Sequence, residues 1–281
     1  MKIILGVDGS KYGTWATDWV LALPFSRPRR VAAIHVVDIA ALRAPFMVQP
    51  AMPGCEGFIQ AEAKRLETLA KRVAKEIRQR LAALKDKAKV SVEKGPVAST
   101  ILKHATGRDA LVVLGHRGLT NLDRFFLGSV STQVSLHARC SVLVVKGPAR
   151  PLRRVLLAVD GSRSSDQALQ FLLKQMSPTS NGRIEVQVLQ VLPPFAHTKE
   201  AMACMARTTR YAQKLETAGY IAKDAIRAGD PAEEIIKAAT SFHADLLIVG
   251  AKGLSAVERF LLGSVSSKVV RHSACSILVV R

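Results

Sequence analysis

The sequence is poor in the residues that mark extracellular, fibrous or membrane-spanning proteins. It has 4 cysteines, 18 glycines and 12 prolines in 281 residues. So few glycines and prolines exclude collagen-like and mucin-like chains, and so few cysteines exclude a disulfide framework. No apolar run approaches the ~18 residues that a membrane span needs, and residues 1–8 lack the apolar core of a signal peptide. We therefore expect a reduced, cytoplasmic protein.

Acidic residues are also scarce relative to basic ones. The chain has 22 Asp and Glu against 41 Lys and Arg, a formal net charge of +19. Exposed positive charge raises the local concentration of any anion, so nucleotides, nucleic acids and acidic surfaces are all plausible partners. The hydrophobic fraction of 48% is that of a globular protein with a sizeable core.

The four cysteines lack the paired spacing of a metal site. Cys140 and Cys275 begin apolar segments, which predicts small buried residues. Cys55 and Cys204 lie elsewhere and are expected to be free thiols.

The chain contains an internal repeat. Residues 3–10 recur at 155–162, an offset of 152, whereas residues 110–119 recur at 245–254, an offset of 135. Such self-similarity indicates a tandem duplication, with about 17 extra residues in the middle of the first copy. We predict a first domain over 1–147, a linker over 148–152 and a second domain over 153–281. They are called copy 1 and copy 2 below.

Each copy alternates short apolar segments with helical patterns. Residues 59–84 place apolar side chains on one stripe and Lys and Arg on the other face, as in an amphipathic helix. Continuous apolar strands that alternate with helices predict an α/β fold, in which helices cover both faces of a five-stranded parallel sheet in each copy. The predicted strands are 2–7, 31–37, 89–93, 110–114 and 141–145, and then 153–159, 184–191, 220–226, 245–249 and 276–280.

A glycine loop follows the fourth strand of each copy. It reads Gly115-x2-Gly118-x9-Gly128-Ser129 and returns as Gly250-x2-Gly253-x9-Gly263-Ser264. Glycines at the carboxyl end of a strand let the backbone approach a ligand, and a helix N-terminus favours an anion. Backbone N–H groups and the hydroxyls of Ser129 and Ser131, or of Ser264 and Ser266, could hold phosphate. The alternative is that the glycines only make a turn and that Ser129 and Ser264 only cap a helix.

Together with Asp8-Gly9-Ser10 and its repeat at 160–162, these loops resemble the universal stress protein family in its tandem form. The resemblance covers nearly the whole chain except the insert at 40–60. It implies two Rossmann-like domains and a stress-response protein that binds ATP, with Mg²⁺, where the glycine motif is complete.

The resemblance also implies roles for residues by position. Asp8 and Asp160 would lie on the adenine and ribose side of the nucleotide, and Val36 and Val191 would present backbone groups to the base. The residues around the ribose and phosphates would be Gly115, Gly118, Gly128 and Ser129 in copy 1, and Gly250, Gly253, Gly263 and Ser264 in copy 2. Asp8 and Asp160 also suit a simple turn between strand and helix.

The two copies differ in one respect that favours the second site. Copy 2 reads Gly229-Asp230-Pro231, in which Asp230 suits a helix N-cap and Pro231 the first helical position. Copy 1 reads Gly95-Pro96-Val97 and lacks that acid. The insert could also fold across the first pocket, so we expect copy 2 to be the better site.

Residues that would support catalysis are missing from the loops. They lack the lysine of a P-loop, and the chain has no His-Glu-x-x-His or Cys-x-x-Cys pair. We therefore expect a nucleotide-dependent sensor or regulator, with slow ATP hydrolysis or nucleotidyl transfer as the enzymatic alternative. Arg117 and Lys252 could pair with phosphate or be solvated, and His116, which Ala251 replaces in copy 2, is expected at the surface.

A further alternative is nucleic-acid or anionic-surface binding through the basic face of residues 59–84. That face lacks the aromatic residues on which single-stranded nucleic acids stack, so a solvated helix face is the simpler interpretation.

The closing strands at 141–145 and 276–280 are short and apolar. If they lay at sheet edges they would invite strand pairing. We expect them to pair within the chain, as an intramolecular pseudo-dimer, and a homodimer is also open.

Overall fold

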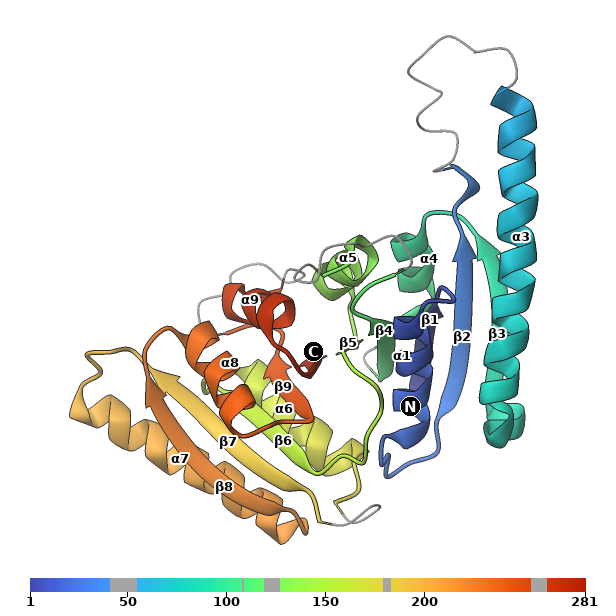
Figure 1. The fold of residues 1–281 in the computed structure, drawn as a ribbon. Helices are drawn as coiled ribbons and strands as arrows, with labels where there is room; N and C mark the ends of the chain where they lie inside the picture. The colour runs from blue at the N-terminus through green and yellow to red at the C-terminus, as the bar shows by residue number, and fades with distance from the viewer. Residues whose placement is uncertain (41–54, 108, 119–126, 179–182, 254–261) are drawn as a thin grey trace.

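The computed structural model describes residues 1–281 except 41–54, 108, 119–126, 179–182 and 254–261. In the described part of the chain, ten strands form one sheet in the order β3-β2-β1-β4-β5-β10-β9-β6-β7-β8 (Figure 1). Within each copy all neighbouring strands are parallel. The predicted α/β fold, with two Rossmann-like domains in tandem, is confirmed.

Copy 1 contains β1 (Lys2–Val7), α1 (Lys11–Ala22), β2 (Arg30–Val37), α3 (Cys55–Arg80), the 3₁₀ helix η2 (Ala82–Lys87), β3 (Ala88–Lys94), α4 (Val97–His104), β4 (Ala110–Gly115), α5 (Ser129–His137) and β5 (Ser141–Val145). Copy 2 contains β6 (Arg154–Val159), α6 (Arg163–Gln175), β7 (Glu185–Leu192), α7 (Thr198–Thr217), β8 (Ile221–Ala228), α8 (Pro231–Ser241), β9 (Leu246–Gly250), α9 (Ser264–His272) and β10 (Ser276–Val280). All ten predicted strands are present within two residues of their expected bounds.

Helices cover both faces of the sheet. Side chains from α1, α3, α6 and α7 pack in one apolar core, and those from α4, α5, α8 and α9 pack in another. Successive strand residues alternate between the two, so Leu5 joins the first core and Ile4 the second. Both cores contain residues of both copies, which makes the sheet continuous in its packing as well as in its hydrogen bonds.

The amphipathic helix predicted over 59–84 begins and ends earlier than expected. Regular α-helix ends at Arg80, and the chain continues as η2, where the amide of Leu84 donates to the carbonyl of Leu81. Lys85 then adopts φ 49°, ψ −132°, which no helix can contain. Most of the insert at 40–60, which the sequence suggested could cover the first pocket, lies outside the described residues.

The closing strands meet at the centre of the sheet. β10 runs antiparallel to β5, with Val279 opposite Val142 and Leu278 opposite Leu143. Both strands are buried throughout. The expected pairing of the two copies within one chain is therefore confirmed, and the sheet edges are β3 and β8 instead.

Candidate functional site

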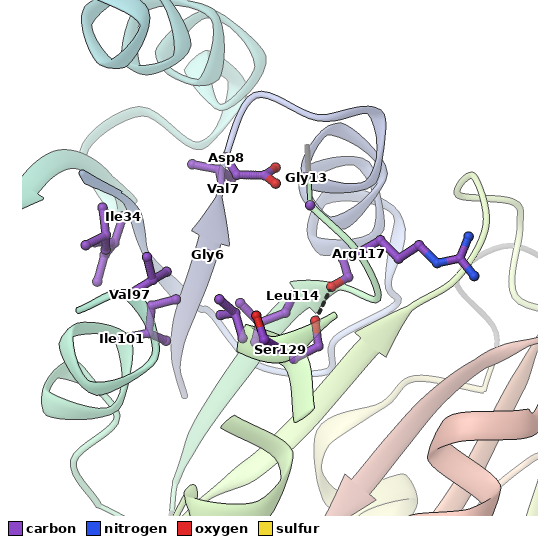
Figure 2. Close-up of a pocket in the computed structure, with 15 residues that line it drawn as sticks. Gly6, Val7, Asp8, Gly13, Ile34, Val97, Ile101, Leu114, Arg117 and Ser129 are labelled. Carbon is purple, nitrogen blue, oxygen red and sulfur yellow. Dashed lines mark hydrogen bonds between the residues drawn. The ribbon is translucent and has the colours of Figure 1, made fainter. Parts of the chain in front are cut away.

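A cavity of about 240 Å³ opens at the carboxyl ends of β1, β2 and β4, next to the start of α5. In Figure 2 Ile34, Val97 and Ile101 gather on one side of it, while Asp8 and Ser129 lie apart from them. Its lining residues are Gly6, Val7, Asp8, Gly13, Ile34, Val36, Val97, Ile101, Leu114, Gly115, Arg117, Gly118, Ser129, Val130 and Ser131. An apolar wall opposite polar groups at the carboxyl edge of a parallel sheet is the usual arrangement of a ligand site.

Asp8 both shapes the turn after β1 and faces the glycine loop. Its Oδ1 accepts from the amide of Ser10 at 3.0 Å and from the Ser10 hydroxyl at 2.6 Å. Ser10 in turn caps α1 by accepting from the amide of Gly13. Asp8 Oδ2 points the other way, 2.7 Å from where a Cβ would stand on Gly118. The turn role and the site role of Asp8 therefore use different oxygens.

The two glycines of the Gly-x2-Gly motif have different neighbours. A Cβ on Gly115 would stand 2.6–2.8 Å from the Cβ and backbone of Tyr12, whereas a Cβ on Gly118 would meet the Asp8 carboxylate. Packing of β4 against α1 thus accounts for Gly115, which was expected to surround ribose and phosphates. Gly118 is the glycine whose missing side chain brings the loop close to the candidate site.

The start of α5 corrects the expected caps. Gly128, not Ser129, occupies the N-cap position, and Ser129 is the first helical residue. The hydroxyl of Ser131, proposed as a phosphate donor, already donates to the carbonyl of Gly115 at 2.7 Å. The amide of Gly128 donates to the carbonyl of His116 at 2.7 Å. These two bonds tie the start of α5 to the end of β4, so Ser131 holds the loop closed.

Copy 2 repeats this backbone geometry. Gly263 is the N-cap of α9, where Ser264 had been expected, and its amide donates to the carbonyl of Ala251 at 2.8 Å. The hydroxyl of Ser266 donates to the carbonyl of Gly250 at 2.7 Å. Residues 119–126 and 254–261, between the clamped ends, lie outside the described residues.

The glycines of copy 2 also have equivalent neighbours. A Cβ on Gly253 would stand 2.8 Å from Asp160 Oδ2, and one on Gly250 would stand 2.6 Å from the Ser164 Cβ. Asp160 Oδ1 accepts from the amide of Ser162 and the hydroxyl of Ser165, each at 2.9 Å. Asp160, like Asp8, therefore uses one carboxylate oxygen for the turn and directs the other towards the second glycine of the motif.

The two copies differ on the side of the site nearest α3 in copy 1 and α7 in copy 2. In copy 1 Val73 of α3 lies beside the Gly9 turn. In copy 2 Arg207 of α7 lies over the Gly161 turn, its guanidinium carbon 2.5 Å from where a Cβ of Gly161 would stand. Its Nη1 donates to Gln190 Oε1 at 2.9 Å. A cation therefore stands where copy 1 has a methyl group.

The expected base-facing residues lie at corresponding places. Val36 on β2 lines the cavity and is half-buried. Val191 on β7 is half-buried as well.

His116 is not the surface residue that its absence from copy 2 suggested. Its ring packs edge-on against Tyr12 at 4.6 Å, and Tyr12 packs edge-on against Trp15 at 5.2 Å. Its Nδ1 lies 3.2 Å from the carbonyl oxygen of Val145. Burial, with the nearby charges of Arg117 and Lys146, lowers the pKa of His116 to about 4. The imidazole is therefore neutral at physiological pH.

This aromatic group was not predicted, although Tyr12 and Trp15 are three residues apart on one helix face. Arg117 was expected to reach phosphate. Its side chain is 9% exposed and extends away from the cavity in Figure 2.

The described lining of the cavity offers a carboxylate, the start of a helix and an apolar wall. Asp8 is the one carboxylate among the described lining residues, and a single carboxylate suits a Mg²⁺ that takes most of its ligands from phosphate oxygens and water. Among the described residues, no group of three or more His, Cys, Asp or Glu could hold a metal ion by itself. Nor does any described helix have the length and apolar character to cross a membrane.

The basic face of α3 is partly neutralised. Arg65 pairs with Glu62, Lys94 of β3 pairs with Glu67, and Arg80 pairs with Glu76 and Asp18. Cys140 is buried as expected, Cys275 is only half-buried although a buried residue was predicted, and Cys204 is buried; all three are free thiols. The side chain of Cys55 lies outside the described residues.

Comparison with known proteins assigns the family. The sequence profile of the universal stress protein family matches residues 1–146 and again residues 151–281. A universal stress protein of Mycolicibacterium smegmatis is 26% identical over 99% of this chain and 96% of its own length. One from Synechocystis is 25% identical over 100% of this chain and 99% of its own.

The fold has solved relatives as well. The crystal structure of a universal stress protein from Archaeoglobus fulgidus superposes with a TM-score of 0.70 at 20% identity, over 100% of this chain and 96% of the other. Family profile, full-length relatives and fold agree, and the chain belongs to the universal stress protein family, with one family domain in each half.

Proposed function

We propose that this chain is a stress-response protein that binds ATP, with Mg²⁺, and acts as a nucleotide-dependent sensor or regulator. The observation that carries the proposal is the cavity of copy 1, where a clamped glycine loop faces Asp8 at the start of a nine-residue helix. Membership of a family in which a complete glycine motif accompanies ATP binding supports the same ligand.

Each part of the cavity fits one part of the nucleotide. Ile34, Val97 and Ile101 form an apolar wall against which a base would lie, and the backbone of Val36 is placed to contact its edge. Asp8 Oδ2 would accept from ribose hydroxyls or hold Mg²⁺. The first amides of α5 and the positive end of its dipole favour phosphate, which needs no further cation in the cavity.

We place the first site in copy 1, although the sequence favoured copy 2. Asp230 does cap α8 as expected, since its side chain accepts from the amide of Glu233 at 3.0 Å. That cap lies outside the glycine loop, however, and Arg207 lies over the Gly161 turn of copy 2. The loop of copy 2 keeps every backbone contact, so we propose a second, weaker site there.

Titration of the purified full chain with MgATP by calorimetry tests the proposal, together with identification of any nucleotide released on denaturation. Gly118→Val would push a side chain against Asp8, and we expect ATP affinity at copy 1 to fall about tenfold or more. Gly147→Val is the matched control, because a Cβ there meets nothing within 4 Å. Absence of ATP binding in the wild type, or equal binding by Gly118→Val, would overturn the site.

The same experiment separates binding from turnover. A sensor retains ATP intact, whereas steady release of inorganic phosphate that Asp8→Ala abolishes would indicate the enzymatic alternative.

A further inference from the structure

Two cations cross the seam between the copies. Lys146 follows β5 and Arg281 follows β10, and they occupy equivalent positions, 135 residues apart like the glycine loops. The amide of Lys146 donates to the hydroxyl of Ser276 at 3.1 Å, and that of Arg281 donates to the hydroxyl of Ser141 at 3.4 Å. Each chain segment is thus fastened to the closing strand of the other copy.

The side chains then reach the far end of the glycine-loop helix of the other copy. Arg281 donates from Nη2 to the carbonyl of Ser135 at 2.5 Å and from Nη1 to that of Cys140 at 3.2 Å, at the end of α5. Lys146 donates from Nζ to the carbonyls of Ser273 at 2.5 Å and Arg271 at 3.4 Å, at the end of α9. The contact is therefore made twice, once in each direction.

The carbonyl of Cys140 lies in the turn after α5, whereas those of Ser135, Arg271 and Ser273 belong to the groups that a helix leaves without internal partners at its C-terminus. A cation there satisfies them and complements the negative end of the dipole. Both side chains are half-buried, so solvent screens them less than it would an exposed charge. Each cation thus stabilises a helix whose opposite end, about 14 Å away along nine residues, faces the candidate phosphate site.

We propose that Arg281 and Lys146 are positioning residues that act in the other copy: Arg281 of copy 2 sets the anion affinity of the α5 site in copy 1, and Lys146 of copy 1 sets that of the α9 site in copy 2. The inference rests on the proposed nucleotide site. It makes each site incomplete without the other copy and gives the tandem chain a direct electrostatic link between its two loops. A unit charge about 14 Å away changes anion affinity about twofold to sevenfold for effective dielectric constants between 80 and 20.

The test uses the full chain with one site disabled at a time. In a Gly253→Val background, which reports on copy 1, we expect Arg281→Gln to weaken MgATP binding about threefold, and by more than Lys146→Gln does. In a Gly118→Val background, which reports on copy 2, we expect the reverse. Arg281→Lys and Lys146→Arg keep the charge and should restore most of the affinity.

Hydrogen exchange without nucleotide gives an independent measurement. Arg281→Gln should speed amide exchange in α5 and not in α9, and Lys146→Gln should do the opposite. A loss of ATP affinity that is equal at the two sites or larger in the variant's own copy, or no loss in a chain that binds ATP, would overturn the inference. If the wild type binds no ATP, the proposed function fails, and hydrogen exchange alone then tests the crossed contacts of Arg281 and Lys146. Exchange that is unchanged, or that changes in both helices, would overturn these contacts.

Discussion

The two copies share the backbone of their loops and differ in the side chains around them. In both, the amide of the loop's third glycine and a serine hydroxyl close the loop onto the preceding strand. Around that frame, copy 1 has Tyr12, Trp15 and His116 where copy 2 has Ser164, Gln167 and Ala251. Duplication has therefore kept the contacts that fix the loop and has varied those that set its surroundings.

The same pattern holds for Asp8 and Asp160. Each uses one oxygen for the turn, but the hydroxyl on that oxygen comes from Ser10 in copy 1 and from Ser165 in copy 2. Position 13 in copy 1 is a glycine, whose Cβ would stand 2.9 Å from Asp8 Oδ1. The carboxylate is thus held in place by different residues, which indicates that its position, rather than one donor, is what the fold requires.

The largest effect on stability is expected from a substitution at the seam between the two copies. Val279 is fully buried opposite Val142, and Val279→Lys would place an unpaired charge in the core that α4, α5, α8 and α9 cover. We expect a loss of about 3–5 kcal/mol in the free energy of unfolding, measured by urea denaturation. Ile221→Lys on edge strand β8 is the control, since Ile221 is 41% exposed and should tolerate the change. Equal stability of Val279→Lys and the wild type would contradict the role of the closing strands.

His116 gives copy 1 an acid sensitivity that Ala251 cannot give copy 2. Because the folded-state pKa of about 4 lies below the ordinary value of 6.5, the unfolded chain binds more protons between these pH values. The stability contributed by neutral His116 is therefore complete above pH 6.5 and lost as pH falls towards 4. Allowing for partial solvation, we expect His116→Ala to remove about 1–2 kcal/mol of this acid-dependent loss. Thermal or urea unfolding of the two proteins between pH 7 and 4 measures this difference. Parallel profiles of stability against pH for the wild type and His116→Ala would refute the prediction.

The N-cap residues of α8 in copy 2 and of α4 in copy 1 should respond to substitution in opposite ways. Asp230→Ala should cost about 1 kcal/mol of stability, because it leaves the amide of Glu233 without its acceptor. Pro96→Asp in copy 1 should add up to about 0.5 kcal/mol, since Pro96 at φ −63°, ψ 125° already has the backbone of an N-cap. Urea midpoints of the two variants should move in opposite directions, and a loss of stability in Pro96→Asp would show that the ring itself is needed.

The smallest expected effect is a difference in pH dependence between the two cations that cross the seam, Lys146 and Arg281. Burial lowers the pKa of Lys146 to about 8 and that of Arg281 to about 10. Lys146 faces the thiol of Cys275, whose pKa burial raises, and the cation of Arg117. Raising the pH from 7 to 9 should therefore discharge Lys146 and leave Arg281 charged.

We expect ATP affinity at copy 2 to fall about twofold over that range and affinity at copy 1 to fall less. Calorimetry in the two single-site backgrounds gives the measurement. Lys146→Arg should abolish the pH dependence at copy 2, and a fall at copy 1 alone would reverse the assignment.

The helices and strands and their order along the chain follow from the sequence alone. Apolar segments of strand length cannot be solvated, and segments with helical periodicity must cover them, so the ten strands follow from the pattern. The offset of the repeat placed both glycine loops, and their spacing identified the family. Local capping chemistry was also readable at Asp230, where the acceptor and the amide that it caps are three residues apart.

The contacts of each described loop residue, in contrast, depend on how distant parts of the chain pack together. Tyr12 packs where a side chain of Gly115 would stand, the hydroxyl of Ser131 donates to the carbonyl of Gly115, and burial lowers the pKa of His116. In the first two cases the residues in contact are far apart in the sequence. The crossing of Lys146 and Arg281 depends on β10 lying antiparallel to β5, because only that pairing brings the end of each closing strand to the last turn of the other copy's helix. Periodicity records which face of an element is buried but not which distant residue it meets, so these contacts could not be predicted from the chain alone.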